Sequence, residues 1–229
     1  MVIGFDIGGS NIKGVLLNGK KILRFFEVPT PKTLKNFQKL ILKLWDNISP
    51  VKIGIGVAGK INGTKVISAT NIKYFKNYDF NQLSNQVAKL ELDNDARCFA
   101  RAEYKIGSGK GVKSMLMITL GTGIGRAYGE NGKILKIEKF EKEEKWEKEY
   151  QKIKDKNKLT KFLSEKLAPI IYPLDPEIVV LGGGVADKKG YYKAIEKALK
   201  IEGQGARVKK SKLGKFAGAI GAAMLFHTS

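Results

Sequence analysis

The segment FDIGGSNIKG, residues 5–14, places an aspartate, two glycines and several polar side chains directly after an apolar run. Glycine lets the backbone approach a phosphate closely and turn its N–H groups toward oxygen atoms. Asp6 can hold Mg²⁺, because this ion prefers hard oxygen ligands and keeps much of its water. Ser10, Asn11 and Lys13 add donors and a cation. Glycine pairs after strands are common, so this segment alone is compatible with a phosphate site without requiring one.

Four further segments carry residues of the same kinds. Two of them, LGTGIG (120–125) and LGGGV (181–185), are glycine turns after apolar runs. LDNDA (92–96) places carboxylates where a short strand ends and a helix begins, and GIGVAGKIN (54–62) runs from a strand into a loop. If the chain folds as two lobes that face each other, we expect these segments to converge on one cleft.

The charge balance is strongly basic, with 42 Lys and Arg residues against 22 Asp and Glu residues and a net charge of +20. Such a charge attracts nucleic acid, acidic membranes or phosphorylated ligands. Lysine supplies most of it, whereas base and phosphate readers usually rely on arginine and on exposed aromatic residues. We therefore interpret the charge as a solvated lysine-rich surface and do not expect nucleic-acid binding.

Other function classes are disfavoured by composition. No apolar run approaches the ~18 residues that cross a bilayer, and no leader pattern opens the chain, so we expect a cytoplasmic protein without membrane contact. Cys98 is the one cysteine, which excludes a disulfide within the chain, and His227 is the one histidine. A His/Cys cluster cannot form, and we expect no zinc.

Short strands and hairpins are predicted in the first half of the chain. The apolar runs at 2–8, 12–19, 21–28 and 52–59 read as strands, and Asn-Gly at 18–19 and 62–63 predicts tight hairpin turns. The 3.6-residue spacing of apolar side chains predicts a helix at 32–46. The remaining predictions for this half are a helix near 79–90, a strand at 90–95 and a helix from 96 to about 104.

The second half repeats this plan. Strands are predicted at 114–121, at 123–137 with a hairpin turn at Asn131-Gly132, at 177–185 and near 206–212. Helices are predicted near 159–171, at 188–200 and from about 215, and the spacing of Trp146, Tyr150 and Ile153 predicts a further packed helical face. The flexible segment IGSGKG (106–111) marks the boundary. We expect lobes at 1–107 and 108–229, the last helix packing back on the first lobe.

These motifs, in this order, resemble the ROK family of sugar kinases, within the actin-like, sugar kinase and Hsp70 ATPase superfamily. FDIGGSNIKGVLLNGK is similar to the first phosphate motif of the family, GIGVAGKIN to its substrate loop, and TNIKYF to the stretch before a substrate-domain helix. DNDARCFARAEY resembles its catalytic motif, ITLGTGIG its second phosphate motif, and IVVLGGGVA with GAIGAA its adenosine side. The resemblance implies a two-lobed actin-like ATPase (ribonuclease H-like) α/β fold with mixed sheets flanked by helices.

The resemblance also implies a role for individual residues. Asp95 corresponds to the general base that accepts the proton of the attacking hydroxyl, and Asp6 to the residue that assists Mg²⁺, directly or through water. The sugar side comprises Asn94, Gly59, Lys60, Thr70 and Arg97. The ATP side comprises Gly8, Gly9, Ser10, Asn11, Lys13, Gly121, Thr122, Gly123, Gly183 and Gly184. The implied activity is ATP-dependent phosphorylation of a hydroxyl of a sugar or sugar derivative, as in a glucokinase, and relatives suggest a homodimer.

Each assignment has a structural alternative. Asp95 stands where a helix N-cap is often found, and Asn94 could simply close the turn. Gly182 to Gly184 could serve close packing of a strand and a helix, and Thr122 could be a cap. Cys98 is expected to be a small core residue, because free cysteine is usually buried.

The chain departs from the family pattern between its second phosphate motif and its adenosine motif. The family's Glu-x-Gly-His element and zinc loop are absent, so the chain is a shortened form, and Glu147 or Glu149 could replace a lost sugar contact. Arg97 stands where asparagine is common. A cation there could lower the pKa of Asp95 or contact an anionic acceptor. A non-catalytic nucleotide or sugar sensor, or a kinase for a non-sugar or anionic acceptor, is the alternative function.

Overall fold

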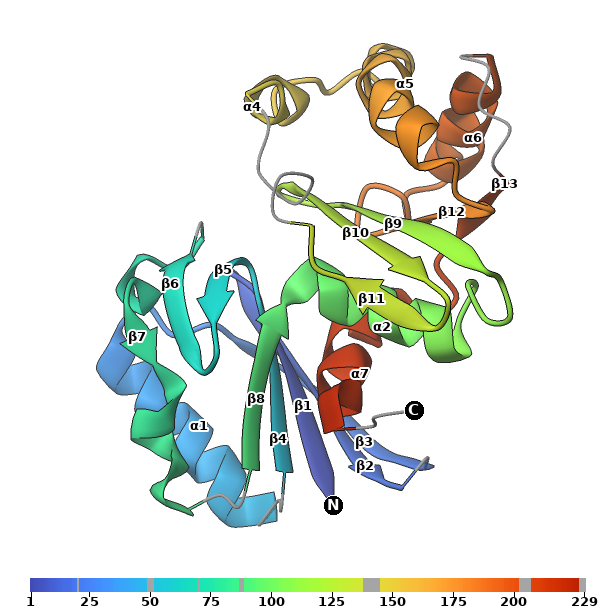
Figure 1. Ribbon diagram of the computed structural model, residues 1–229. Coiled ribbons are helices and arrows are strands. Elements are labelled where there is room, and N and C mark those ends of the chain that lie inside the picture. Colours follow the sequence, from blue (N-terminus) through green and yellow to red (C-terminus); the bar gives the residue numbers. More distant parts are fainter. Residues whose placement is uncertain are drawn as a thin grey trace. The chain divides into compact units, whose positions relative to one another are not determined.

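The computed structural model describes residues 1–19, 21–48, 52–69, 71–86, 89–137, 145–201 and 207–226. Contacts among Cα atoms divide the chain into two units (Figure 1). Unit 1 comprises Met1–Ala102 and Phe216–Ser229, and unit 2 comprises Glu103–Lys215. Among the described residues, no helix is both long enough and apolar enough to span a bilayer.

Unit 1 is built on a five-stranded sheet in the order β3-β2-β1-β4-β8. Strands β1, β2 and β3 pair antiparallel, whereas β1, β4 and β8 run parallel. The inner strands are apolar on both faces, so the sheet supplies the core of the unit. The bounds of the strands are β1 (Val2–Ile7), β2 (Asn11–Asn18), β3 (Lys21–Pro29), β4 (Lys52–Val57) and β8 (Lys89–Asn94).

Helix α1 (Leu34–Ile48) and a small second sheet complete one side of unit 1. Phe37 of α1 is fully buried and meets Phe75 and Phe80 edge to face. The small sheet comprises β5 (Gly59–Asn62), β6 (Lys65–Ala69) and β7 (Tyr78–Asp79), with the 3-10 helices η1 (Lys73–Phe75) and η2 (Phe80–Gln86) beside it in sequence.

The prediction of a helix near 79–90 is wrong. Residues 78–79 form strand β7, and residues 80–86 form a 3-10 helix. Asp79 accepts hydrogen bonds from the Thr64 hydroxyl (2.8 Å) and from the N–H of Asn81, two residues further along the chain (2.9 Å). Such local side-chain bonds offer the backbone an alternative to the α-helix, and sequence periodicity does not reveal them.

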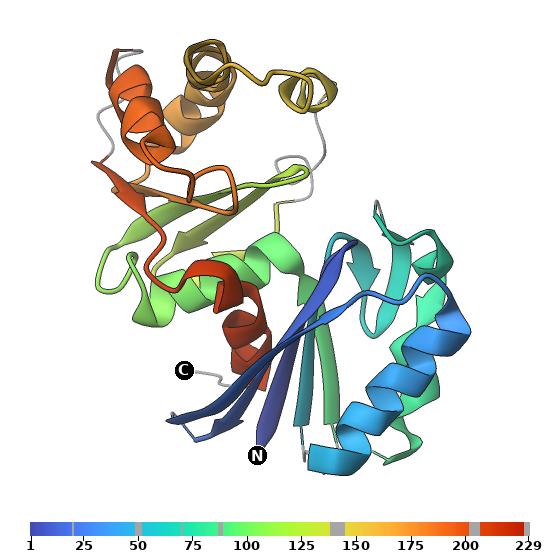
Figure 2. The ribbon, with the colours of Figure 1, turned by 180° about the vertical axis from the view of Figure 1, so that it is seen from behind.

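Helix α7 (Ala217–Ala223) lies against β1 and β4 on the other side of the unit 1 sheet from α1 (Figures 1 and 2). The approach is close enough that a Cβ at Gly4 would lie 2.1 Å from the Ala219 oxygen, and one at Gly54 1.9 Å from the Ala222 oxygen. The small residues of AGAIGAA are therefore needed for this contact, which draws the end of the chain into unit 1. Short 3-10 helices flank α7, η4 (Gly214–Phe216) before it and η5 (Met224–Phe226) after it.

Unit 2 repeats the sheet plan of unit 1, with the strand order β11-β10-β9-β12-β13. Helices α5 and α6 cover one face of this sheet, and their leucines pack on its buried residues (Figure 1). The strands are β9 (Ser114–Leu120), β10 (Ile124–Glu130), β11 (Lys133–Leu135), β12 (Ile178–Gly182) and β13 (Arg207–Lys210). The helices are α4 (Glu147–Tyr150), α5 (Lys156–Ile171), η3 (Tyr172–Leu174) and α6 (Tyr191–Ile201).

The three hairpins predicted from Asn-Gly turns are confirmed, as β2–β3, β5–β6 and β10–β11. The helical face predicted from Trp146, Tyr150 and Ile153 is shorter than expected, because α4 ends at Tyr150. The charged run that precedes it lies partly outside the described residues, at 138–144.

The units divide inside helix α2 (Asp95–Ile106), at 102/103, whereas the sequence predicts a boundary at 107/108. Glu103 explains the earlier division. Its buried carboxylate accepts hydrogen bonds from the N–H groups of Ser108 (2.8 Å) and Leu213 (2.8 Å) and from the Ser211 hydroxyl (2.7 Å). These partners belong to unit 2, and they tie the end of α2 to it.

Candidate active site

The parallel strands of unit 1 end at one level. Ile7 of β1 pairs with Val57 of β4, which pairs in turn with Asn94 of β8. The carboxyl ends of parallel strands are where α/β sheets place ligands. Asp6 precedes the first of these ends and Asp95 follows the last. The register of the sheet thus brings together two acidic residues that lie 89 positions apart in the sequence.

Asp6 is a partly buried carboxyl group with an abnormal acidity. Burial, and then the neighbouring charge of Asp95, raise the pKa of Asp6 from 3.8 to about 7, and the Lys13 ammonium opposes this rise. Lys13 is its cross-strand partner on β2. Helix α7 packs closely against Asp6, since a Cβ at Gly218 would lie 2.6 Å from the Asp6 carboxylate.

The cap of α2 is Asn94 and not Asp95. The Asn94 amide oxygen accepts hydrogen bonds from the N–H groups of Ala96 (2.9 Å) and Arg97 (3.3 Å), and its amide nitrogen donates to the Gly59 carbonyl (3.4 Å). Asp95 also accepts from the Ala96 N–H through Oδ1 (2.9 Å). The Asp95 carboxylate accepts a further hydrogen bond from its own backbone N–H.

Burial raises the pKa of Asp95, and this effect exceeds the lowering by its backbone hydrogen bonds and by the Arg97 guanidinium. The pKa change that we predicted from Arg97 therefore has the expected direction, but it is smaller than the effect of burial. A carboxylate with a raised pKa is a stronger base.

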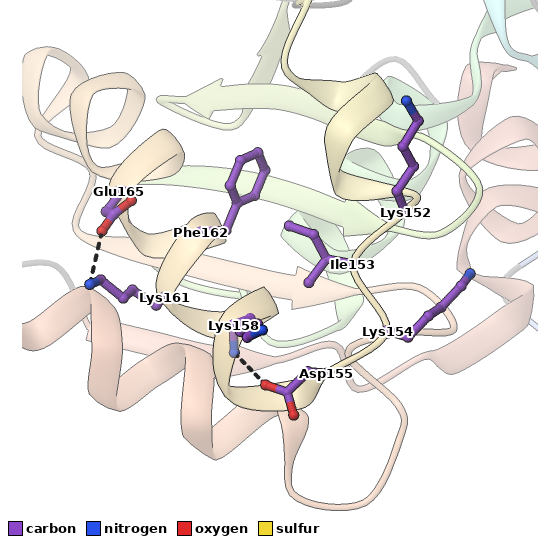
Figure 3. A pocket seen from close by; sticks show the side chains of 8 residues that line it. All are labelled: Lys152, Ile153, Lys154, Asp155, Lys158, Lys161, Phe162 and Glu165. Carbon is purple, nitrogen blue, oxygen red and sulfur yellow. Dashed lines mark hydrogen bonds and ion pairs between the residues drawn. The ribbon is translucent and has the colours of Figure 1, made fainter.

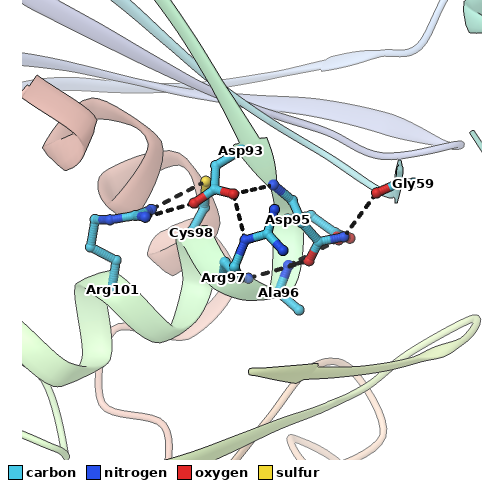
Figure 4. Close-up of polar contacts among 8 residues, drawn as sticks. Gly59, Asp93, Asp95, Ala96, Arg97, Cys98 and Arg101 are labelled. Atoms are coloured by element: carbon cyan, nitrogen blue, oxygen red, sulfur yellow. Dashed lines mark hydrogen bonds and ion pairs between the residues drawn. The ribbon is translucent and has the colours of Figure 1, made fainter. Parts of the chain in front are cut away.

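Arg97 is almost fully buried and is paired with an acidic side chain. Its guanidinium forms a salt bridge with Asp93, four residues before it, and its side chain is 8% exposed. Arg101 binds the other Asp93 oxygen at 2.6 Å (Figure 4). Asp93 also accepts the Asn94 N–H at 2.8 Å. This ion-pair cluster fixes the turn that carries Asn94 and Asp95, and the substrate contact assigned to Arg97 stays a prediction.

The β1–β2 turn uses one of its predicted donors internally. The Gly8 N–H donates to the Asn11 carbonyl (3.0 Å), and the Gly8 carbonyl accepts the Thr30 hydroxyl (2.6 Å). Gly9, Ser10 and Asn11 are exposed. The Gly8 N–H thus helps to shape the turn, and the phosphate contacts assigned to the turn stay a prediction.

Asn71 lies against the same turn, because a Cβ at Gly9 would lie 2.9 Å from the Asn71 Cβ. Thr70, the residue of TNIKYF that we predicted to contact the sugar, lies outside the described residues. The tight approach of Asn71 to Gly9 is a tertiary contact, and no local pattern could have indicated it.

The loop after β4 meets the Asn94 turn. Gly59 has a φ of +146°, and a Cβ there would lie 2.0 Å from the Ser68 oxygen, so this position requires glycine. Its carbonyl receives the Asn94 amide. Lys60 is exposed on β5. Gly59 thus joins the substrate loop to the turn that carries Asp95.

Unit 2 holds the other two glycine turns next to each other. Thr119 of β9 pairs with Gly182 of β12, and the Val185 N–H donates to the Leu120 carbonyl (2.9 Å). At Gly183, with φ +89°, a Cβ would lie 2.6 Å from the Leu120 oxygen, so the fold itself requires this glycine.

Three other glycines of these turns are not required by the fold. A Cβ at Gly123 or Gly184 meets no atom within 4 Å, one at Gly121 comes only to 4.0 Å from the Gly123 oxygen, and none of the three has a positive φ. Open space over a glycine suits a ligand that approaches the backbone.

The residues present fit Mg²⁺. The described residues contain no group of three or more His, Cys, Asp or Glu side chains able to hold a metal ion by themselves. Mg²⁺ is usually bound through one or two carboxylates and the phosphates of its substrate, which does not need such a group. Asp6 and Asp95 supply two carboxylates whose mutual repulsion a divalent cation would relieve.

A pocket of about 510 Å³ in unit 2 contains none of the predicted site residues (Figure 3). Four lysines and two acidic residues line this pocket. Both acidic residues have structural partners: Asp155 caps α5 through the Lys158 N–H (2.8 Å), and Glu165 lies 3.9 Å from the Lys161 ammonium. The other lining residues are Lys152, Ile153, Lys154 and Phe162. It is an open surface feature of the start of α5.

Two sheets of the same strand order, each with a glycine turn after its central strand, define the actin-like ATPase fold. Solved structures agree. The ROK family glucokinase from Streptomyces griseus in complex with glucose and AMPPNP has a TM-score of 0.81 at 23% identity, over 98% of each chain. The inorganic polyphosphate/ATP-glucomannokinase from Arthrobacter sp. strain KM has a TM-score of 0.77 at 29% identity, over 97% of this chain and 96% of that chain.

The model of the ROK family matches residues 2–139 and 143–229, and the chain belongs to this family. Among curated relatives, the glucokinase of Streptomyces coelicolor is 36% identical over 137 residues. This match spans 55% of the chain and 42% of the glucokinase, which is less than half the length of that relative. The resemblance stated from the motifs is confirmed at the level of family and fold.

Proposed function

We propose that this chain is an ATP- and Mg²⁺-dependent kinase that phosphorylates a hydroxyl group of a sugar. One observation carries the proposal: Asp95 lies beside Asp6 at the aligned ends of β1, β4 and β8, and Asn94, not Asp95, caps the helix. The relatives reported above are named as glucokinases and a glucomannokinase, which supports a sugar as the acceptor.

In this proposal unit 1 handles the acceptor. Asp95 accepts the proton of the attacking hydroxyl, and burial favours that transfer because it raises the pKa of this carboxyl. The Asn94 amide nitrogen has two hydrogens, of which one is used on Gly59, so the other can donate to a neighbouring sugar hydroxyl. Gly59 and Lys60 lie on the adjoining loop. Mg²⁺ held near Asp6 would neutralise charge on the phosphates.

Unit 2 supplies the backbone donors for the nucleotide. The turn at 121–123 offers N–H groups to the phosphates, and Gly184 offers open backbone for the adenosine. Gly183 keeps the two turns together. Phosphoryl transfer depends mainly on positioning and on charge stabilisation, which is what these groups provide.

The acceptor that we propose is a neutral sugar. Arg97, the residue that suggested an anionic acceptor, is almost fully buried and is bound to Asp93. The excess of lysine could instead favour an anionic phosphoryl donor, and the Arthrobacter relative is named for both polyphosphate and ATP.

A coupled assay of ADP release tests the proposal. The full chain is incubated with ATP and Mg²⁺ and with glucose, mannose, N-acetylglucosamine, gluconate or glucose 6-phosphate, and sugar phosphate formation from polyphosphate is measured in parallel. We expect saturable turnover with at least one neutral sugar. Saturable ATP binding without turnover on any acceptor would instead identify a sensor. Faster turnover of the anionic compounds would overturn the neutral acceptor.

A further inference from the structure

The C-terminal end of helix α4 is attached to the glycine turn at 121–123 by two side-chain hydrogen bonds. The Tyr150 hydroxyl donates to the Gly121 carbonyl (2.9 Å), and the Gln151 amide donates to the Thr122 carbonyl (2.6 Å). The two donors are consecutive in the chain, and so are the two carbonyls. Two neighbouring peptide groups of the turn are therefore held in a fixed orientation.

The orientation of these carbonyls determines where the next N–H groups point. In a trans peptide the C=O and the following N–H point in opposite directions, and the described residues contain no cis peptide bond. When the Gly121 and Thr122 carbonyls face α4, the N–H groups of Thr122 and Gly123 face away from it. Neither N–H has a hydrogen-bond partner among the residues that the structure describes, and both residues are exposed.

The short helix is itself firmly anchored. Glu147 and Arg126 form a buried ion pair at 2.9 Å, with side chains 3% and 1% exposed, and Glu147 also accepts the Ile124 N–H at 3.4 Å. Tyr150 is 3% exposed. Burial, and then the charge of Glu147, raise the pKa of Tyr150 to about 12, so its hydroxyl keeps its proton and remains a donor. Trp146 meets Phe162 of α5 edge to face.

We propose that Tyr150 and Gln151 are positioning residues that aim the N–H groups of Thr122 and Gly123 at the terminal phosphates of the nucleotide. This inference rests on the nucleotide-binding part of the proposed function. Two adjacent N–H groups on one side of a turn form an anion-binding site. The segment that carries the two residues lies where the chain lacks the family's Glu-x-Gly-His element and zinc loop.

The test measures binding of AMP, ADP and the non-hydrolysable AMPPNP to the full chain by titration calorimetry, without sugar. Tyr150→Phe removes the hydroxyl and keeps the ring, and Gln151→Met removes the donor and keeps the length. Each variant should weaken AMPPNP and ADP about 3- to 10-fold, the value of one hydrogen bond. AMP should change less than about twofold, since it lacks the terminal phosphates.

Tyr104→Phe is the matched control. Its hydroxyl also donates to a backbone carbonyl of unit 2, that of Lys113 (2.7 Å), but at the opposite end of β9 from the turn. It should leave all three affinities unchanged. If Tyr150→Phe lowers the melting temperature strongly, Gln151→Met decides the test, because its side chain is exposed.

The outcomes separate this inference from the proposed function. An equal loss for AMP and AMPPNP, or no loss in either variant, overturns the positioning role. A wild-type chain that binds no nucleotide overturns both the inference and the ATP-dependent function. Normal nucleotide binding with a phosphate-selective loss in the variants, but no turnover on any sugar, supports the inference and overturns the kinase.

Discussion

The two sheets of the molecule share one plan and differ in chemistry at equivalent places. Ile7 and Leu120 form the last antiparallel pairs before the glycine turns, with Ile12 and Ile124. The residue before each is Asp6 in unit 1 and Thr119 in unit 2. The acidic side chain is partly buried and titrates abnormally, whereas the Thr119 hydroxyl simply accepts the Gly125 N–H (3.1 Å).

The glycine turns of the two units also differ, in how their backbone N–H groups are used. In unit 1 the Gly8 N–H is consumed by the Asn11 carbonyl, while in unit 2 the N–H groups of Thr122 and Gly123 remain available within the described structure. The repeated topology therefore accounts for the positions of the turns, and the side chains around them decide their use. This difference supports our proposal that unit 1 carries the proton and metal chemistry and that unit 2 binds phosphate through its backbone.

The largest expected effect comes from removing the proposed general base of unit 1, Asp95. Asp95→Asn should lower kcat by about 10²- to 10⁴-fold, the usual contribution of a general base, because asparagine cannot accept the hydroxyl proton. Nucleotide affinity, measured by calorimetry, should remain within about threefold. Steady-state kinetics with the best sugar from the acceptor panel provide the rates.

Asp155→Asn is the control for this variant, since it removes the same charge from an exposed position of unit 2, and asparagine caps a helix as well as aspartate does. It should leave kcat unchanged. Near-normal turnover of Asp95→Asn would remove the division of labour between the units.

Two neighbouring glycines of unit 2 should respond in opposite ways. Gly183→Ala places an alanine in a left-handed backbone conformation and brings its Cβ against the Leu120 oxygen. This should lower the free energy of unfolding by about 1–3 kcal/mol or more and the melting temperature by several degrees. Gly184→Ala meets open space and should change stability by less than about 0.5 kcal/mol. The same variant should weaken ATP binding, because the added methyl group covers backbone proposed for the adenosine.

Differential scanning calorimetry and nucleotide titration of both variants check this pair. If Gly184→Ala binds ATP like the wild type, the open glycine has no role in recognition, and the phosphate function of unit 2 is confined to the turn at 121–123.

Local signals made part of this architecture predictable. Asn-Gly turns and apolar runs define the three hairpins within a few residues of sequence, and the motifs around Asp6 and Asp95 indicate the family. The residue that caps α2 could not be predicted from the sequence, because Asn94 and Asp95 are both suitable caps. The observed cap, Asn94, also makes a tertiary hydrogen bond to Gly59. Similarly, the ties from Tyr150 to the turn at 121–123 join residues 29 positions apart. Such contacts depend on tertiary packing and leave no periodic trace.

The smallest expected effect is a pH-dependent change in stability at Asp6. The pKa of this carboxyl is 3.8 in the unfolded chain and about 7 in the folded protein. Below about pH 4 the group is protonated in both states, and above about pH 7 it is ionised in both. Between these values the folded state alone holds the proton, so the stability contributed by Asp6 falls as the pH rises.

Asparagine imitates the protonated form, so Asp6→Asn should be more stable than the wild type at pH 8 and nearly equal to it at pH 4. Because Asp6 is partly exposed, solvent screens the effect, and we expect about 2–6 °C in melting temperature at pH 8. Scanning fluorimetry from pH 4 to 8 without Mg²⁺ measures the difference, with Asp155→Asn as the control. A difference that does not vary with pH would show that Asp6 ionises normally, and the contrast with Thr119 would then rest on hydrogen bonding alone.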